Sequence, residues 1–476
     1  MSFEINADFE QGQLLPQYLD DRIPADHPAR YIRDFVSSLN MKELGFRVPR
    51  LSSAGRPSYG GRLLLSAWLY GYFHNIRSTR GLERLCRFDL GGIWLTGWQS
   101  PDHNTLWRFI SNNTELISRL FKEVTLVAND LGLVDLVLQA LDGTRIRSAV
   151  STRGSFDAEK LKLMLKDLDT GIKEIMDDIK SQHDTEGKEL RLTEELKNQE
   201  LRRSKIEKAL KELKESGRKK LNPNDADARI MKCGKTNESG YNAQACVDEK
   251  SGLIVAETVV NDENDTKMLT SMVQKVEENL GIKPLQTIAD CGYYSPDELI
   301  KAEEKGIDVL VNIPKQMLPG SNTDKYHKSN FYHDRKKDVF ICPEGKELVY
   351  CGKKRDRHNK DMIVRLYRCT GYKSCSKRYE CSKAKRGRII ERGPHYEAVI
   401  RQLEKQREEA SREKLKRRKS IVERVFAHIK WNMGFNRFMF RGLAKVKTQW
   451  SIVCSVYNLK KIYKIWRVNK QTFALT

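Results

Sequence analysis

The stretch Leu136-Val-Leu-Gln-Ala-Leu-Asp142-Gly-Thr144 is a short apolar run that ends in an Asp-Gly pair. A second run of this kind, Leu285-Gln-Thr-Ile-Ala-Asp290-Cys-Gly292, also ends at an aspartate. Apolar runs bounded by turn residues are typical of buried strands. Because functional groups of open α/β sheets lie at strand ends, we expect Asp142 and Asp290 to meet at one edge of a sheet.

Two carboxylates placed that close together repel each other and stay ionised only with help from cations. A pair of Mg²⁺ ions is the natural partner of such an arrangement. Taken alone, each aspartate is more simply a turn or capping residue, so the pair carries the hypothesis and neither member does.

The strand pattern continues around a hairpin turn. Residues 240–248 and 253–260 have the composition of strands and flank the turn Glu249-Lys-Ser-Gly252. A helix is expected over about 265–281, and a strand over 307–313 after a further short helix. The order is strand, insertion, two strands, helix, strand, helix, strand. This order predicts an α/β fold that resembles an RNase H-like core.

Two insertions interrupt the predicted core. In the first, residues 157–221, apolar residues recur in steps of four and three from Leu161 to Ile179, which is a heptad seam. A polar break that contains Gly187 follows, so we predict an antiparallel helical hairpin (coiled coil), with a single long solvated helix as the alternative. The second insertion, residues 316–398, is polar and holds a cluster of cysteines.

The N-terminal region is expected to be helical. Its apolar and Arg-bearing runs, 62–73 and 79–87, suit a helix-turn-helix-like DNA module and equally a packing or dimerisation domain. The expected domains are a helical N-terminal DNA-binding or assembly domain (1–130), two parts of the catalytic core (131–156 and 222–315), the helical hairpin (157–221), the Cys-rich insertion (316–398) and the basic C-terminal helices of the core (399–476).

The chain of 476 residues is strongly basic, with 86 Lys and Arg against 64 Asp and Glu and a net charge of +22. Residues 401–470 alone hold 20 Lys and Arg against 5 Glu. Such a surplus favours nucleic acid as the partner, because phosphate contacts release condensed counterions, and a solvated basic surface is the alternative. No run reaches the ~18 apolar residues of a membrane span. Since the chain also starts without a signal peptide, we expect a cytoplasmic, nucleoid-associated protein with no membrane partner.

A third acid stands on a predicted basic helix. Residues 422–433 carry the apolar spacing of a buried helix stripe, and Glu423 lies at its edge. Lys430 follows two turns later on nearly the same face. An acid turned toward a metal, with a lysine for a DNA phosphate, fits this placement, and a solvated salt-bridge partner is the alternative. Asp225 and Asp227 lie in a polar loop without a preceding strand and are weaker candidates.

Several of these motifs together carry a family resemblance. Leu141-Asp-Gly-Thr144 looks like a first-acid motif and Ala289-Asp-Cys-Gly-Tyr-Tyr-Ser295 like a second. Gly240-Tyr-Asn-Ala-Gln-Ala245 matches the strand after the insertion, and Val422-Glu-Arg-Val-Phe-Ala-His-Ile-Lys430 the third-acid block. In this order the motifs resemble bacterial insertion-sequence transposases of the DDE class, in the group marked by a Tyr-x2-Arg-x3-Glu-x6-Lys signature.

The resemblance implies an active transposase with an RNase H-like catalytic core. Asp142, Asp290 and Glu423 would hold two Mg²⁺ ions, for which Mn²⁺ can substitute. The site would carry out DNA strand cleavage and strand transfer by in-line displacement. The implied partners are double-stranded DNA, at the terminal inverted repeats of the element and at its target, and further copies of the chain in a homo-oligomer.

The same resemblance implies DNA contacts. Counting back from Glu423, Lys419 stands at the signature's Arg position, and Arg418 lies one residue away. Trp431 would stack on an unpaired or flipped base, with a core position at a helix end as the alternative. The residues expected to hold phosphates are Arg145, Arg147, Arg418, Lys419 and Lys430.

Four of the ten cysteines form a candidate zinc set, namely Cys342, Cys369, Cys375 and Cys381. Their spacing is wider than the Cys-x2-4-Cys pairs of tight zinc sites. The missing signal peptide argues against a disulfide framework. The pattern therefore favours free thiols in a reducing compartment, with a structural Zn²⁺ ion as the alternative.

Two other functions stay open at this point. A catalytically silent protein derived from a transposase would bind terminal repeats without cutting them, although the presence of all three acids argues against it. A nuclease relative would hydrolyse DNA without strand transfer.

Overall fold

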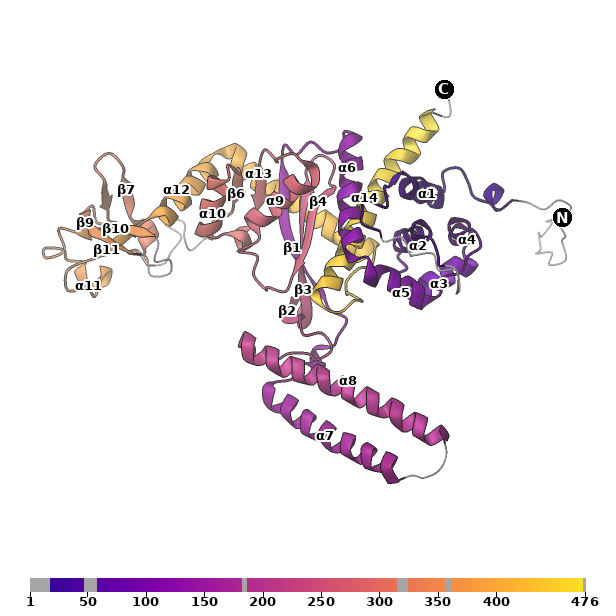
Figure 1. Ribbon diagram of the computed structural model, residues 1–476. Helices are drawn as coiled ribbons and strands as arrows, with labels where there is room; N and C mark the ends of the chain where they lie inside the picture. The colour runs from indigo at the N-terminus through magenta and orange to yellow at the C-terminus, as the bar shows by residue number, and fades with distance from the viewer. Residues whose placement is uncertain (1–17, 47–57, 182–185, 315–323, 356–361, 474–476) are drawn as a thin grey trace, which may run out of the picture. The chain divides into compact units, whose positions relative to one another are not determined.

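The structure is a computed structural model that describes residues 18–46, 58–181, 186–314, 324–355 and 362–473 (Figure 1). The first 17 residues of the expected N-terminal domain lie outside this description. The chain divides into two compact units. The first comprises residues 1–124 and 451–476, and the second comprises residues 125–450.

The first unit is helical, as the sequence predicts for this region. α2 is apolar on nearly all sides, and its Trp68, Tyr70 and Tyr72 are fully buried. A helix buried all round is a core helix, and α2 packs against α1, α3, α4 and α5. The elements of this unit are η1 (Leu19–Arg22), α1 (Pro28–Ser38), α2 (Gly61–Phe73), α3 (Thr79–Phe88), α4 (Leu90–Thr96), α5 (His103–Asn112), most of α6 (Thr114–Asp130) and the end of α14 (Leu443–Phe473).

The second unit is built on a mixed sheet. Within the described residues its six strands are β1 (Gln139–Arg147), β2 (Arg229–Cys233), β3 (Thr236–Asp248), β4 (Ile254–Val260), β5 (Thr287–Ala289) and β6 (Val309–Val311). β1, β5 and β6 are parallel, and β3 is antiparallel to β1. The long β3 pairs with β2 along its first half and with β4 along its second half. The sheet therefore has the order β4-β3-β1-β5-β6, with β2 beside the start of β3.

The strands after the first insertion agree with the sequence pattern. β3, β4 and β6 fall within the predicted ranges to within a few residues, and Gly252 turns β3 into β4 with a φ of 62°. β2 is an addition, because its residues Arg-Ile-Met-Lys-Cys mix polar and apolar side chains too evenly to stand out as a strand.

One prediction about the first strand is wrong. The apolar run predicts an end at Asp142, whereas β1 continues to Arg147. The parallel pairing with β5 covers only Gln139 to Leu141, and the antiparallel pairing with β3 carries β1 further. Asp142 therefore stands where β1 loses its parallel neighbour, in the middle of the strand.

Helices cover the sheet. Those of this unit are α9 (Leu269–Leu280), η3 (Cys291–Tyr293), α10 (Pro296–Glu304), α12 (Pro394–Arg407) and α13 (Glu409–Ala427). α9 packs on β3 and β4, while α13 packs on β1, β3, β5 and β6. Val422, Val425 and Phe426 of α13 are buried at the helical period. α13 runs into a π-helical turn, η6 (His428–Asn432), so the α-helical phase stops at Ala427.

The first insertion forms two helices, α7 (Ala158–Ser181) and α8 (Glu186–Ser216), which lie antiparallel and side by side (Figure 1). Leu161 and Leu168 of the predicted seam pack in one apolar cluster with Ile206, Ala209 and Leu213. The alternative of a single long helix is therefore wrong, because the two helices bury their apolar faces against each other.

The second insertion contains a small sheet of its own, which we call the cysteine module (residues 324–392, of which 356–361 are not described). Its described strands, in the order β11-β10-β9-β8-β7, are all paired antiparallel. They are β7 (Tyr332–Asp334), β8 (Val339–Ile341), β9 (Glu347–Arg355), β10 (Ile363–Cys369) and β11 (Ile389–Arg392), with the short helices η5 (Lys328–Asn330) and α11 (Arg378–Cys381) between them.

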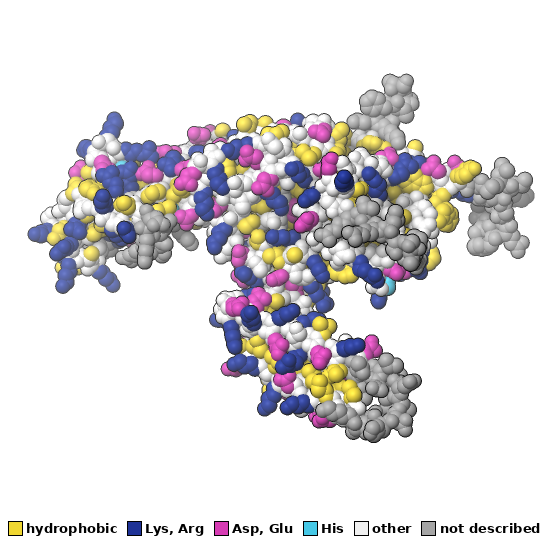
Figure 2. Space-filling model, viewed as in Figure 1, with side chains coloured by type: hydrophobic (Ala, Val, Ile, Leu, Met, Phe, Trp, Pro, Cys, Tyr) yellow, Lys and Arg dark blue, Asp and Glu magenta, His cyan; other side chains and the backbone are white. Residues whose placement is uncertain are grey.

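Lys and Arg side chains are prominent on the face of the cysteine module seen in Figure 2. The sequence of this module holds 21 Lys and Arg against 9 Asp and Glu. No helix among the described residues is both long enough and apolar enough to cross a membrane.

The helical hairpin depends on its small apolar cluster. Leu213 is 5% exposed there, so Leu213→Ala should remove about 2–5 kcal/mol of packing and speed hydrogen exchange at the amides of α7 and α8. Leu201→Ala is the matched control, because Leu201 lies on the same helix and is 57% exposed. Equal exchange in the two variants would show that this cluster does not hold the hairpin together.

Candidate functional site

Asp142 and Asp290 are neighbours across the parallel strands β1 and β5. Leu141 pairs with Ala289 in this register, so the residues that follow them stand side by side. One guanidinium serves both carboxylates. Arg418 Nη1 lies 2.8 Å from Asp142 Oδ2, and Arg418 Nη2 lies 3.9 Å from Asp290 Oδ2. The structure thus brings the two aspartates and a residue of α13 to one place.

Arg418 occupies a position that the sequence does not predict. Its side chain is only 8% exposed, and its donors face Asp142 and Asp290. A buried guanidinium requires anionic partners, and the two carboxylates supply them. That Arg418 binds a DNA phosphate stays a prediction, and in this structure Arg418 Nη1 donates a hydrogen bond to Asp142 Oδ2.

Burial dominates the electrostatics of Asp142. It raises the pKa of Asp142 to about 6, even though the charge of Arg418 lowers that pKa, and the neighbouring Asp290 raises it further. Asp290 is more open to solvent, and its Oδ1 accepts a hydrogen bond from the Gly292 amide at 2.8 Å. Burial therefore brings Asp142 nearer to neutrality than an ordinary aspartate.

Asp265 is a third acid at this place, and no sequence pattern above points to it. A Cβ added to Gly292 would lie 2.9 Å from Asp290 Oδ1 and 3.5 Å from Asp265 Oδ2. A Cβ on Gly143, next to Asp142, would lie 3.0 Å from Asp265 Oδ1. The signal that could have identified Asp265 is the direction of the strand before it, because β4 runs in the same direction as β1 and β5. The loop after β4 therefore opens at the same edge of the sheet.

Two amides of β3 hold Asp265 in place. Asn242 Nδ2 and Gln244 Nε2 each donate a hydrogen bond of 2.6 Å to Asp265 Oδ1. The fully buried Tyr293 donates its hydroxyl to Gln244 Oε1, which fixes the orientation of that amide. Arg145 Nη2 lies 3.8 Å from Asp265 Oδ2. The motif that precedes the hairpin turn thus orients an acid of the site.

Gly143 permits this close packing. A Cβ at this position would lie 2.3 Å from Gln244 Nε2 and 2.9 Å from Asn242 Oδ1, well inside contact distance. Any side chain would push the amides, and Asp265 with them, away from Asp142. The glycine of the Asp-Gly pair therefore makes room for the acids and does not form a turn.

Glu423, the third predicted acid, has an exposed side chain on α13. It follows Arg418 by five residues, which is about 140° around an α-helix, so the two side chains leave the helix in different directions. Among the residues that the structure describes, no three His, Cys, Asp or Glu side chains are gathered as ligands of one ion. The structure therefore brings Asp142 and Asp290 together and places Asp265 beside them.

Arg145 and Lys430, both predicted phosphate contacts, lie beside the acids. Lys430 Nζ is 3.4 Å from the Arg145 carbonyl, and burial lowers the pKa of Lys430. The predicted placement of Lys430 on the face of Glu423 relied on a continuous α-helix. The π-helical turn that starts at His428 changes that phase.

The other predicted contacts lie further toward solvent. Lys419 is exposed on α13, and Arg147 is partly exposed at the end of β1. Trp431 is 82% exposed, so the alternative that places it in the core is wrong. A large aromatic side chain held in solvent next to the site is available for a partner.

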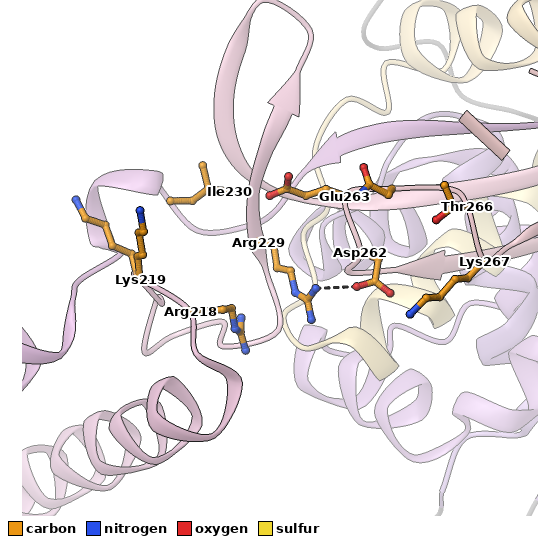
Figure 3. Close-up of a pocket in the computed structure, with 10 residues that line it drawn as sticks. Arg218, Lys219, Arg229, Ile230, Asp262, Glu263, Thr266 and Lys267 are labelled. Carbon is orange, nitrogen blue, oxygen red and sulfur yellow. Dashed lines mark hydrogen bonds and ion pairs between the residues drawn. The ribbon is translucent and has the colours of Figure 1, made fainter. Parts of the chain in front are cut away.

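A basic groove borders the loop that carries Asp265 (Figure 3). The cavity measures about 680 Å³ and is lined by Arg218, Lys219, Lys220, Arg229, Ile230, Asp262, Glu263, Asn264, Thr266 and Lys267. Its lining includes both chain neighbours of Asp265, and the Glu263 carbonyl accepts a hydrogen bond of 2.6 Å from Arg145 Nη2. Figure 3 shows Arg218 and Lys219, from the segment after α8, across the groove from the loop that carries Lys267.

Asp225 and Asp227, the weaker candidates, have structural partners. The Asp225 carboxylate accepts from the Tyr241 hydroxyl at 2.5 Å and from the Gly442 amide at 3.0 Å. Asp227 accepts from the amide of Leu443, the first residue of α14, at 2.7 Å. Both acids therefore satisfy backbone donors at the start of a helix, which is a capping role.

Two regions of the chain match known protein families. Residues 341–463 match the family described as "Transposase DDE domain", and residues 17–112 match the "Transposase domain (DUF772)". No curated protein matches the chain. The first matched region includes Arg418 and Glu423, and the second lies in the N-terminal helical unit. A DDE domain implies the use of divalent metal ions, and a transposase implies DNA binding.

The pKa of Asp142 predicts a pH dependence of stability. The folded-state value of about 6 lies above the ordinary value of 3.8, so the folded chain binds this proton more tightly than the unfolded chain. The contribution of Asp142 to the free energy of unfolding therefore falls as the pH rises through this window and is constant above it. Asp142→Asn removes the titration, so its Tm relative to wild type should rise between pH 4 and pH 6.

Thermal unfolding across this pH range measures the difference. Glu413→Gln, at an exposed position of α13, is the control for replacing an acid by an amide. A Tm difference between Asp142→Asn and wild type that is the same at both ends of the range would mean that Asp142 is not the titrating group.

Proposed function

We propose that this chain is a DDE transposase of an insertion sequence, which binds terminal inverted repeats, cuts the DNA there and joins the freed ends to target DNA. One observation carries the proposal. Asp142 and Asp290 stand on adjacent parallel strands and share one buried cation, Arg418. Paired carboxylates on a rigid sheet suit a phosphoryl-transfer site that works with two metal ions.

The sheet supports the same function. Only β3 runs against the direction of β1, β4, β5 and β6, and α13 packs across the sheet. This arrangement fits the RNase H-like core that the order of elements in the sequence predicts. We propose that the core is split by the helical hairpin and the cysteine module, as the expected domain boundaries describe.

The donors fit a divalent metal. Carboxylate oxygens are the preferred ligands of Mg²⁺. The positively charged guanidinium of Arg418 already lies against both aspartates. Bound Mg²⁺ or Mn²⁺ supplies activation of the attacking hydroxyl or water and stabilises the leaving oxygen. In this proposal Asp142 and Asp290 would hold the ions in place of the guanidinium of Arg418.

The third ligand has two candidates. Glu423 is implied by the resemblance and lies within the matched DDE domain. Asp265 is favoured by geometry, because its carboxylate flanks Gly292 together with that of Asp290 and is oriented by two amides. We propose Glu423 as the catalytic acid and Asp265 as the residue that orients the site and balances the charge of Arg145.

The DNA contacts follow from the placement of the cations. The basic groove borders the loop that carries Asp265, so we propose that it binds the backbone of the transposon end. Trp431 is exposed and would stack on a base freed from the duplex, while Lys419 and Lys430 would hold phosphates near it. The N-terminal helical unit would bind DNA or assemble copies of the chain into the homo-oligomer that joins two ends, within the cytoplasm.

The competing functions differ in the products they make. A silent DNA-binding protein would retain the groove without cutting DNA. A nuclease would cut DNA without joining a 3′ end to a target. A strand-transfer assay with a precut 3′ end separates the transposase from the nuclease.

Substitution of the paired aspartates tests the proposed chemistry. With a labelled duplex that carries the element's terminal repeat, wild type should cut at the repeat end only with Mg²⁺ or Mn²⁺. Asp142→Asn and Asp290→Asn should each slow cutting by about 10²–10³-fold or more, because each removes a carboxylate that would hold the metal ions. Binding without cutting in wild type would favour the silent protein, and cutting that survives both substitutions would overturn the assignment.

The same assay decides between the candidates for the third acid. Glu423→Gln should stop cutting while DNA binding persists, and Glu413→Gln on the same helix is the matched control. If Glu423→Gln cuts DNA at the wild-type rate and Asp265→Asn does not cut, Asp265 replaces Glu423 as the third acid.

Salt dependence tests the groove. Removing two phosphate contacts by Lys219→Ala with Lys220→Ala should reduce the slope of log K against log salt by about 1.8, since each contact contributes about 0.9. Lys208→Ala with Lys214→Ala is the matched control, because these lysines are exposed on α8 and do not line the groove. Equal slopes for the two double variants would place the DNA elsewhere.

A further inference from the structure

The four candidate cysteines of the cysteine module come together in space. Cys342, Cys369, Cys375 and Cys381 all line one small cavity of about 30 Å³, although up to 39 residues separate them in the sequence. Burial raises the pKa of both Cys369 and Cys381, and each of these thiols is near enough to Cys342 and Cys375 for their charges to raise it further. The wide spacing in the sequence therefore hides a compact group.

The strands place the cysteines at one end of the small sheet. Cys342 directly follows β8 and Cys369 ends β10, and these two strands run in the same direction because each is antiparallel to β9. Cys381 ends α11, and Cys375 lies in the loop before that helix. The four cysteines, from separate segments, thus lie together at this end of the sheet.

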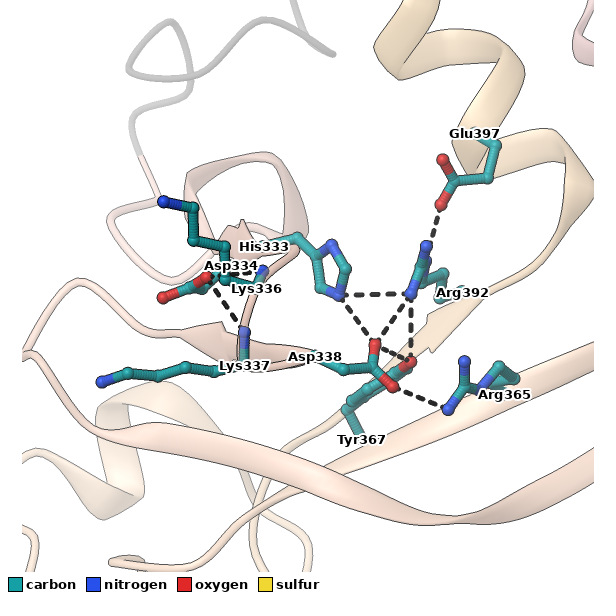
Figure 4. Close-up of polar contacts among 9 residues, drawn as sticks. All are labelled: His333, Asp334, Lys336, Lys337, Asp338, Arg365, Tyr367, Arg392 and Glu397. Carbon is teal, nitrogen blue, oxygen red and sulfur yellow. Dashed lines mark hydrogen bonds and ion pairs between the residues drawn. The ribbon is translucent and has the colours of Figure 1, made fainter.

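The opposite end of the sheet is held by charged and polar groups (Figure 4). Asp338, just before β8, accepts from Arg392 Nη1 at 2.9 Å and from the Tyr367 hydroxyl at 2.9 Å. Arg392 also pairs with Glu397 of α12 at 2.6 Å, and Arg365 pairs with Asp338 at 2.7 Å. One end of the sheet therefore carries the four thiols, and the opposite end carries a network of ion pairs and hydrogen bonds.

The apolar core between the two ends is small. Its buried cluster comprises Phe331, Phe340, Leu348, Tyr367 and Ile390. A sheet of fewer than about 70–80 residues with so few core residues usually needs a staple, such as a metal ion or disulfides. The chemistry of the cysteine end decides which staple this module uses.

The turn after β8 places a backbone donor against the sulfur of Cys342. Gly345 has a φ of 74°, and the Lys346 amide donates to Cys342 Sγ at 3.3 Å. The Gly371 amide likewise donates a hydrogen bond to Cys369, although burial keeps the pKa of that thiol raised overall. Backbone donors aimed at sulfur stabilise the charged form that a metal binds and that a disulfide does not need.

We propose that the cysteine module binds one structural Zn²⁺ ion through Cys342, Cys369, Cys375 and Cys381. Four thiolates around Zn²⁺ form a closed tetrahedral site with a net charge of −2. Lys346, Arg378 and Arg388 also line the cavity and offset that charge. The site holds the small sheet together and takes no part in the chemistry at Asp142 and Asp290.

The described side chains line the cavity without yet forming a ligand set. Rotation about each Cα–Cβ bond moves a sulfur relative to the backbone, and ion binding supplies the free energy that draws the sulfurs inward. The site therefore couples metal binding to the order of the module.

Metal content of the full-length chain tests the proposal. Wild type purified in reducing buffer should contain one zinc per chain by elemental mass spectrometry, and replacement by Co²⁺ should give the visible bands of tetrahedral cobalt thiolate. Cys375→Ser should lose the zinc. Cys351→Ser, an exposed cysteine of β9 that does not line the cavity, is the matched control and should keep it.

Further arms keep the outcomes apart. Asp290→Asn should keep the zinc, and its loss there would place the ion in the carboxylate site and overturn the proposal. Wild type without zinc, zinc retained in Cys375→Ser, or disulfides found by thiol alkylation and mass measurement would overturn it as well. The cobalt spectrum of wild type needs no variant, so a folding failure of Cys375→Ser does not leave the proposal undecided.

Discussion

Two carboxylates held beside each other need positive charge near them, and this need organises the site in the second unit. The parallel register of β1 and β5 places Asp142 and Asp290 side by side, and α13 delivers the guanidinium of Arg418 to both. The buried helix stripe around Val422 and Phe426 fixes α13 on the sheet, so packing and electrostatics specify the same position. In the proposed function a divalent ion would bind the same two carboxylates in place of this guanidinium.

The rest of the site consists of polar groups that keep this cluster of charge in order. Asn242 and Gln244 bond Asp265, Tyr293 bonds Gln244, and Gly143 leaves the space in which these groups meet. Buried polar networks of this kind are costly if any member lacks a partner, which makes the motif residues of β3 as important to the site as the acids. The basic groove lies beside the loop that carries Asp265. Its lysines and arginines are part of the strong positive charge of the chain.

The two insertions differ in the interactions that stabilise their small cores. The helical hairpin buries leucines and isoleucines along two long helices, and that apolar seam is sufficient for an antiparallel pair. The cysteine module has only a small aromatic and aliphatic cluster, an ion network at one end and four cysteines at the other. In the proposed function both insertions belong to a catalytic core. They interrupt the chain between the strands and helices of that core.

The sequence by itself determined the helical N-terminal region, the strands β3, β4 and β6, the paired seam of the hairpin and the identity of Asp142 and Asp290 as neighbours. These features depend on local periodicity and on turn residues, which a linear pattern contains. Tertiary structure alone decided that β1 runs on past Asp142, that Arg418 lies against the acids, that Asp265 joins them and that four widely spaced cysteines share a cavity. Each of these depends on strand direction, helix phase or contacts between distant segments, because residues far apart in the chain meet only when the sheet and its helices are packed.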